Sequence, residues 1–336
     1  MDIEKIKEEL NILNKQLKLV RDEKERLKIK ELIDNKKDEI KILVYRLENS
    51  IKYDNSYLNN SLNIVLESEN RIKYYEGKRN LTHKEKYEYQ LEKECFYINK
   101  YILDNKQNYN KQNNLSYQLR TIVDDYEIFV VITILIIAST IVAEEFREGT
   151  IKLLLIKPYS RGKILLSKYF AVIITLLIVI LYLILLQLMI GGFIFGFSSL
   201  KIPVIVYNFS EGCVIEYNIF IYMLIRILTK IPMLIMLISI SFCFSTVINN
   251  ISTSITLPLF IYIFTSSINY FIVEYKINIF KYFINVNWDF NSYLFGGISK
   301  IDGLSFNFSL IVWIIYFVVI MIFTYLNFKK KNIRNI

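Results

Sequence analysis

Histidine, cysteine and proline are scarce in this chain of 336 residues, which contains one, three and four of them respectively. Because His83 is the single histidine, and Cys95, Cys213 and Cys243 are widely spaced, the sequence predicts neither a zinc site nor a disulfide framework. Nucleophilic catalysis assisted by a histidine is not expected either. No proline precedes Pro158, so the first part of the chain permits long helices.

The sequence also lacks the usual nucleotide and metal motifs. It contains no G-x-x-x-x-G-K-[ST] phosphate loop, no G-x-G-x-x-G and no H-E-x-x-H. Of the carboxylates near the apolar runs, Glu127, Glu144 and Glu274 lie at their ends, so no proton relay is expected at mid-span. We therefore expect a protein that is not itself an enzyme and holds no cofactor or metal.

The charge is concentrated in the first third of the chain. Residues 1–125 hold 25 Lys and Arg and 23 Asp and Glu, whereas residues 126–336 hold 16 and 9, although 53% of the whole chain is apolar. This division predicts a hydrophilic region at 1–125 and a membrane domain at 126–336. The near balance of charge in the first region gives little attraction for phosphate, so no nucleic-acid partner is expected.

Five apolar runs reach the roughly 20 residues that a helix needs to cross a bilayer. They lie at about Tyr126–Ala143, Tyr169–Phe197, within Ile219–Ile248, Ser254–Val273 and Phe308–Phe328. The predicted fold is all-α: a polytopic membrane helix bundle with an N-terminal helical, coiled-coil-like region outside the membrane.

The Lys and Arg residues between the runs predict the orientation. The loop 144–168, the turn near Asn249–Thr253 and the C-terminal tail lie on one side, which carries ten basic residues against four on the other. Cytoplasmic loops carry the excess of Lys and Arg, so we expect a cell-membrane protein whose C-terminus is cytoplasmic and whose residues 1–125 are extracytoplasmic. A hydrophilic region of this length is not expected to cross the membrane on its own, so either the topology is inverted, against the charge bias, or an upstream span is missing.

The first segment carries a heptad pattern. Apolar residues are spaced alternately by three and four, which favours a coiled-coil seam. They are Ile3, Ile6, Leu10, Leu13, Leu17, Val20 and, one heptad later, Leu27. The heptad pattern resumes at Ile33, Ile40, Leu43 and Leu47, and a later helical pattern includes Leu91, Cys95, Ile98 and Ile102. The Asn- and Lys-rich stretches Tyr53–Asn60 and Asn105–Asn114 are expected to be turns, and the whole to form a helical hairpin or small bundle.

Three polar residues within the apolar runs are candidates for a translocation path. Arg226 and Lys230 precede Pro232 in a run about 45 Å long as a helix, so we expect the helix to break near Pro232. The two cations either line a cavity for an anionic or amphiphilic substrate or extend to the headgroups, and headgroups are favoured. Gln187 either contacts substrate or forms a hydrogen bond between helices, and the second is favoured.

The loop at 143–168 has the sequence AEEFREGTIKLLLIKPYSRGKILLSK. The sequence predicts a short helix that ends at Pro158, a turn, and a second helix for which Ser160 is the expected N-cap. The dense apolar cluster at 151–156 fits burial against a partner protein, or packing against the chain's own spans or the membrane interface.

This loop resembles the signature of ABC-2-type transporter permeases, in which an acidic residue precedes Gly-Thr, Leu-Leu, Pro, Ser-Arg and a lysine that enters the next span. The matching residues are Glu145, Gly149, Thr150, Leu153, Leu154, Pro158, Ser160, Arg161 and Lys168, with Glu144 beside them. The segment YRLENSI at 45–51 is similar to an extracytoplasmic helical insert of one branch of the family, and the resemblance covers most of 30–336.

The resemblance implies a six-span permease that pairs with a second permease copy or homologue and with cytoplasmic ATP-binding subunits, which hold ATP and Mg. The loop 144–168 would be the coupling loop seated on the ATPase. The five spans here would correspond to family spans two to six, so a truncated product, a late start or a partner that supplies the first span is expected. The leading hypothesis is a permease of an ATP-driven exporter. The alternatives are a membrane tether or receptor whose helical head binds a partner, an inactive truncated permease and, last, a membrane-embedded enzyme.

Overall fold

The computed structural model describes residues 2–20, 22–49, 56–108, 114–148, 159–248, 250–275 and 278–330. The chain divides into two compact units. Unit 1 comprises residues 1–81 and 88–108, and unit 2 comprises 82–87 and 109–336.

Unit 1 is built from long polar helices: α1 (Asp2–Leu19), α2 (Glu23–Asn49), α3 (Ser56–Glu76) and most of α4 (His83–Asn105). The first two helices contact each other, and the Lys36 and Glu9 side chains pair at 2.9 Å between them. An ion pair of 2.7 Å between Arg71 and Glu92 joins α3 to α4. The predicted helical hairpins are present, because narrow apolar stripes are stable only when paired.

Two positions of the predicted heptad pattern are exposed within this single chain. Ile6, Ile29 and Ile33 are buried, but Leu27 is 59% exposed and Leu47 is 71% exposed. The chain reverses between α1 and α2, so the pattern of the first helix does not continue into the second. The stretch Tyr53–Asn60 is also not wholly a turn, since α3 begins at Ser56. The coiled-coil seam itself stays a prediction.

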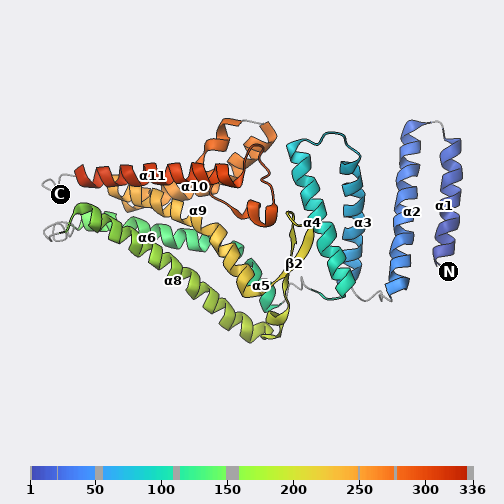
Figure 1. Ribbon diagram of the computed structural model, residues 1–336, viewed down its shortest axis with the longest axis horizontal. Helices are drawn as coiled ribbons and strands as arrows, with labels where there is room; N and C mark the ends of the chain where they lie inside the picture. Colours follow the sequence, from blue (N-terminus) through green and yellow to red (C-terminus); the bar gives the residue numbers. More distant parts are fainter. Residues whose placement is uncertain are drawn as a thin grey trace. The chain divides into compact units, whose positions relative to one another are not determined.

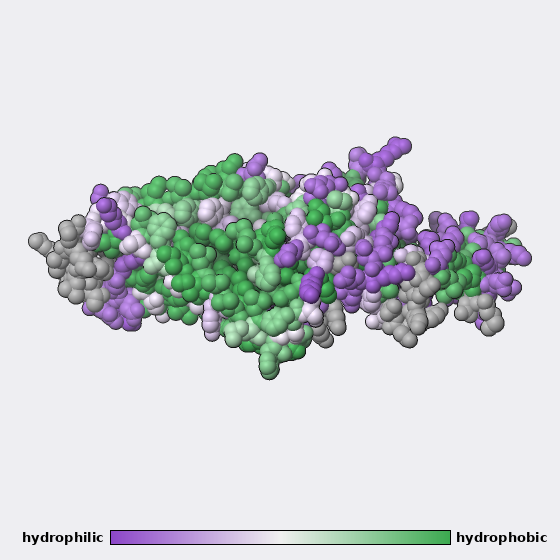
Figure 2. Space-filling model, turned by 60° about the horizontal axis from the view of Figure 1, so that its bottom comes forward, coloured by the Kyte–Doolittle hydropathy of each residue, from purple (hydrophilic) through white to green (hydrophobic). Residues whose placement is uncertain are grey.

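Within the described part of the chain, five helices are long and apolar enough to cross a membrane. They are α6 (Glu127–Arg147), α8 (Arg161–Phe195), α9 (Ile219–Ile248), α10 (Ile251–Tyr275) and α11 (Phe306–Lys330). The five predicted runs are thereby confirmed as helices that fit a multi-pass membrane protein. Figure 2 shows that their surface on this face is largely hydrophobic.

The central helix of unit 2 is α9. It contacts α6, α10 and α11, and 67% of its apolar window is buried, against 17% for α8. Small hydroxyl side chains allow the close contacts. Ser245 donates to the carbonyl of Ser139 at 2.7 Å and accepts from the backbone amide of Ala143 at 2.9 Å. Such hydrogen bonds join apolar helices in a bilayer.

The helix α9 does not break at Pro232, contrary to the prediction. Proline removes the backbone donor for the carbonyl four residues earlier, yet the helix continues, with its two parts packed in two apolar clusters. The indole nitrogen of Trp313 on α11 donates to the carbonyl of Pro232 at 3.0 Å. The first part of α9, through Ile219 and Met223, packs with α5 (Leu115–Asp125), whereas the part after Pro232 packs in the main core.

The helix α8 contacts other helices near both of its ends. Near its N-terminal end it lies beside α6, and it diverges from α6 toward its C-terminal end (Figure 1). A Cβ atom on Gly162 would lie 2.8 Å from the ring of Tyr325 on α11. A Cβ atom on Gly191 would lie 2.8 Å from the side chain of Leu115 on α5. A larger residue at either position would require the Tyr325 ring or the Leu115 side chain to shift, so glycine permits the close approach at each end.

The boundary between hydrophilic and membrane regions also differs from the predicted position at residue 125. The helix α5 contacts α8 and α9 and so belongs to unit 2. Its N-cap is Asn114, whose side chain accepts from the amide of Tyr117 at 2.7 Å. The predicted boundary followed the charge count, which cannot show that the apolar face of a short helix packs on the membrane helices.

Segments outside the apolar helices add structure that the all-α prediction did not include. Between α8 and α9 lie η1 (Ser198–Lys201) and an antiparallel hairpin of β1 (Val204–Asn208) and β2 (Cys213–Tyr217). Between α10 and α11 lie three short 3-10 helices, η2 (Asn278–Tyr282), η3 (Ile284–Val286) and η4 (Asn291–Gly296). Over its described residues, the fold is thus a helical bundle with one small β-hairpin.

Candidate functional site

Unit 2 has polar clusters at its two opposite ends. At the loop end, α6 finishes, α8 begins and α11 finishes. At the network end, α6 begins and five charged residues meet: Asp124, Glu127, Arg226, Lys230 and Asp289. Glu127 and Glu145 are 18 positions apart on α6, so the two ends are separated by about 27 Å at 1.5 Å per residue.

The loop end contains the described residues of the predicted coupling loop. Lys168 on α8 is 9% exposed, forms an ion pair with Glu145 on α6, and donates to the carbonyl of Ile141 at 2.8 Å. A buried ammonium requires such partners, because an unpaired charge in an apolar environment costs several kcal/mol. The two flanks of the loop are therefore joined by one lysine.

Other predicted residues complete this end. Ser160 is the N-cap of α8, as predicted, and accepts from the amide of Lys163. Arg161 donates to the carbonyl of Lys329 at 2.7 Å, which connects α8 to the end of α11. Glu144 is half-exposed and pairs with Arg147 at 3.2 Å. The remaining predicted loop residues, Gly149, Thr150, Leu153, Leu154 and Pro158, lie outside the described residues.

Lys230 is the centre of the network end. Its ammonium donates to Glu127 at 2.7 Å and lies 3.6 Å from Asp289 and 3.8 Å from Asp124. The second oxygen of Glu127 accepts from the hydroxyl of Tyr262 on α10 at 2.7 Å. Five segments of the chain therefore converge on one ion pair.

Arg226 lies one helical turn before Lys230 on the same side of α9. Its guanidinium donates to Asp124 on α5 and to the side chain of Asn291 on η4. Beside them, burial raises the pKa of the hydroxyl of Tyr293, which lies 2.9 Å from the hydroxyl of Ser309. Both predicted cations thus have carboxylate partners, which neither of the two alternatives for them had included.

The third predicted path residue, Gln187 on α8, accepts from the hydroxyl of Tyr126 at 3.2 Å. This contact is the kind of hydrogen bond between helical segments that the sequence favoured. Sequence reasoning missed Asp124, Glu127 and Tyr262 as network members. The available signal was that Asp124 and Glu127 lie at the start of the first apolar run, whereas Arg226 and Lys230 lie within the third.

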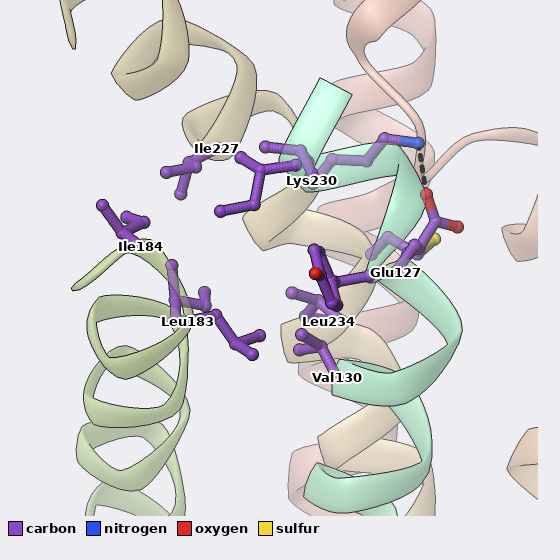
Figure 3. Close-up of a pocket in the computed structure, with 12 residues that line it drawn as sticks. Glu127, Val130, Leu183, Ile184, Ile227, Lys230 and Leu234 are labelled. Carbon is purple, nitrogen blue, oxygen red and sulfur yellow. Dashed lines mark hydrogen bonds and ion pairs between the residues drawn. The ribbon is translucent and has the colours of Figure 1, made fainter. Parts of the chain in front are cut away.

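Two cavities adjoin the Lys230–Glu127 pair. The apolar pocket has a volume of about 50 Å³ and lies between α8 on one side and α6 and α9 on the other (Figure 3). Its walls include Val130, Leu183 and Leu234. The polar cavity, about 350 Å³, lies on the opposite side toward α10 and η3, and its walls include Asn269 and Asp289. Glu127, Lys230 and Met233 line both.

In the described part of the chain, no group of three or more His, Cys, Asp and Glu side chains could hold a metal ion. The three carboxylates of the network end surround a lysine instead, which occupies the place that a cation would take. The arrangement is suited to binding and to conformational change, since it offers charged groups and space at the end of an apolar bundle.

The comparisons with known proteins concern most of unit 2. The family model described as "Protein of unknown function (DUF2705)" matches residues 89–334. The "Uncharacterized protein YhcI" of Bacillus subtilis (strain 168) is 30% identical over 246 residues, which are 72% of this chain and 77% of that protein. No solved structure matches the chain. The matched range contains the five apolar helices, both polar ends and the loop between α6 and α8.

Proposed function

The chain belongs to the DUF2705 family, and from its loop at 144–168 we propose that it is the membrane-spanning permease subunit of an ATP-binding-cassette exporter. Its sequence resembles ABC-2-type permeases, and it has no phosphate loop of its own. In this proposal a separate cytoplasmic subunit binds ATP and Mg, a second permease copy or homologue completes the path, and membrane lipid surrounds the bundle.

The single observation that carries the proposal is the joining of the loop's two flanks by Lys168. The lysine connects α6 to α8 through Glu145 and the carbonyl of Ile141, and Arg161 extends the connection to α11. A loop fixed in this way can transmit a displacement of its apolar residues to three membrane helices, since packed elements shift as units. A loosely tethered loop could not.

Orientation is part of the proposal. The loop end carries the larger number of Lys and Arg residues, which supports a cytoplasmic loop and C-terminus and an extracytoplasmic unit 1 in the cell membrane. We expect a single cysteine at the exposed Asn35 position, on a cysteine-free background, to react with a membrane-impermeant maleimide in intact cells. A cysteine at the exposed Tyr159 position should react only after the cells are opened. The reverse pattern would exclude contact between the loop and a cytoplasmic ATPase.

Association with an ATPase is the direct test of function. We expect the tagged full chain, co-expressed with an ATP-binding-cassette ATPase from a neighbouring gene, to retain that ATPase during purification. Replacement of Leu153 and Leu154 by aspartate should reduce retention about tenfold or more, because central apolar anchors dominate interface affinity.

The matched control is Ile279→Asp, which changes an apolar side chain that is 67% exposed and lies on η2, beyond the opposite end of α10. It should retain the ATPase like the unchanged chain. Absence of the ATPase from the purified unchanged chain, or equal loss in both variants, would contradict the proposed function.

A second candidate function is a membrane tether or receptor. Unit 1 exposes large apolar side chains, including Leu19 at 81% and Leu47 at 71%, which fits a surface that binds a partner. This candidate predicts that the full chain functions without any ATPase, so the retention experiment distinguishes the two.

A further inference from the structure

The two cavities at the network end share a wall but differ in chemistry. The pocket toward α8 is lined mostly by aliphatic side chains from α5, α6, α8 and α9. The cavity toward α10 is lined by polar and charged groups, among them Tyr262, Asn269 and Asp289. Its volume of about 350 Å³ is within the range of small-molecule sites, roughly 300–1,000 Å³.

The polar cavity has an excess of negative charge. Lys230 is within 4 Å of three carboxylates, and Arg226 pairs with one of them, Asp124. Three carboxylates and two cations leave the group with one uncompensated negative charge. Asp289 has the weakest compensation, since it lies 3.6 Å from Lys230 and its side chain is 46% exposed, and it lines the polar cavity. A cationic group is therefore the complementary occupant.

A further acceptor points to the same ligand chemistry. The side-chain oxygen of Asn269 is buried and has no hydrogen-bond partner, and this residue lines the polar cavity. A buried acceptor without a donor costs about 1–3 kcal/mol, which a ligand N–H group would recover. An ammonium group supplies three donors and a positive charge, and so complements Asp289; it reaches the Asn269 oxygen after a turn of that side chain, because the oxygen has almost no accessible surface as it stands.

The wall between the cavities includes one flexible apolar residue. Met233 belongs to the main apolar core and lines both spaces. Methionine is unbranched and adapts its shape to a neighbour. Figure 3 shows the pocket that it borders, with Leu183 and Ile184 of α8 facing Val130 and Leu234 across the space.

We propose that the network end binds a single-chain cationic amphiphile. The ammonium group lies in the polar cavity beside Asp289 and Asn269. The first part of the hydrocarbon chain passes Met233 into the apolar pocket, and the rest extends between α6 and α8 into the surrounding lipid. This inference rests on the proposed function in that the occupant would be the transported substrate class, but binding itself requires no ATPase.

The test is equilibrium dialysis of radiolabelled dodecylammonium against the purified full chain in nanodiscs of zwitterionic phospholipid, with protein-free nanodiscs subtracted. Saturable binding at one site is expected, and dodecyl sulfate, which has the same chain and the opposite charge, should show none. Asp289→Asn should weaken binding about tenfold, the loss expected for a hydrogen bond to a charged group. Asp289→Glu should restore it.

The variant Leu183→Trp tests the part of the site that holds the hydrocarbon chain of the ligand. Its larger side chain fills the apolar pocket and should weaken binding of dodecylammonium about fivefold or more, because the ligand then loses its buried apolar contacts there. Glu211→Gln is the control, because Glu211 is an exposed carboxylate in the β1–β2 turn and lines neither cavity. Thermal unfolding of each variant in the same nanodiscs establishes that it is folded before dialysis.

Equal binding of dodecyl sulfate, or unchanged binding by Asp289→Asn, would overturn the proposal. Loss of binding in Asp289→Asn together with full binding in Leu183→Trp would overturn the proposal that the ligand is an amphiphile, and would indicate a site for a small cation. Saturable binding without ATPase retention would reject the proposed exporter alone, whereas ATPase retention without saturable binding would reject this inference alone.

Discussion

Replacement of Lys230 by methionine is expected to lower the free energy of unfolding of the membrane bundle by about 3–5 kcal/mol, the cost of removing one partner from a buried ion pair. Lys230 is 12% exposed, and its replacement would leave Glu127, Asp289 and Asp124 around an uncharged side chain. Only Arg226 would then balance the three negative charges. Thermal unfolding of the purified chain, followed by the fraction that remains monodisperse after heating, measures the effect.

The size of this loss depends on the carboxylates that remain, and this provides the control. Adding Glu127→Gln to Lys230→Met should recover part of the stability, since it removes the carboxylate that made the shortest contact, 2.7 Å. Lys201→Met changes an exposed lysine on η1 and should alter stability by less than about 0.5 kcal/mol. A loss for Lys230→Met no greater than that for Lys201→Met would show that the network contributes little to stability.

Replacement of Lys168 by methionine is expected to release the flanks of the loop at 144–168. Without the ammonium, Glu145 is left as a partly buried carboxylate, and the carbonyl of Ile141 loses a donor. The amides at 142–148 and 161–168 should then exchange with deuterium on the order of 100-fold faster, because local opening no longer has to break these contacts. Hydrogen-exchange mass spectrometry of the full chain in nanodiscs measures this directly.

The matched control for that experiment is Lys163→Met, which removes an exposed lysine five residues earlier on α8. Its exchange rates should equal those of the unchanged chain, and the network end should be unaffected in both variants because it lies about 27 Å away along α6. Equal exchange in Lys168→Met and in the unchanged chain would mean that Lys168 does not hold the loop.

The sequence predicted those parts of the fold that depend on local composition. The five apolar helices and the Ser160 cap follow from runs of neighbouring residues, so they could be located without knowledge of the packing. The continuity of α9 could not be predicted, because it depends on packing against distant segments; the contact of Trp313 with the carbonyl of Pro232 joins positions 81 residues apart. Local rules for proline predict a break there.

The candidate site was predictable only in part for the same reason. Arg226 and Lys230 stand out as cations in an apolar run, but their partners are far away in the sequence. Glu127 is 103 positions from Lys230, and Asp124 is 102 positions from Arg226. The β-hairpin was missed because its two five-residue strands lie within a stretch that hydropathy alone identifies as a connection between spans.

The attachment of α8 through Gly162 and Gly191 determines how this helix meets the bilayer. At 1.5 Å per residue its 35 residues extend about 52 Å, whereas the hydrocarbon of a bilayer is about 30 Å thick. A free helix of this length would adjust its tilt to each membrane that contains it. Because α8 contacts α11 near one end and α5 near the other, we expect the protein to limit its inclination and the lipids beside it to adjust their length to cover its apolar middle.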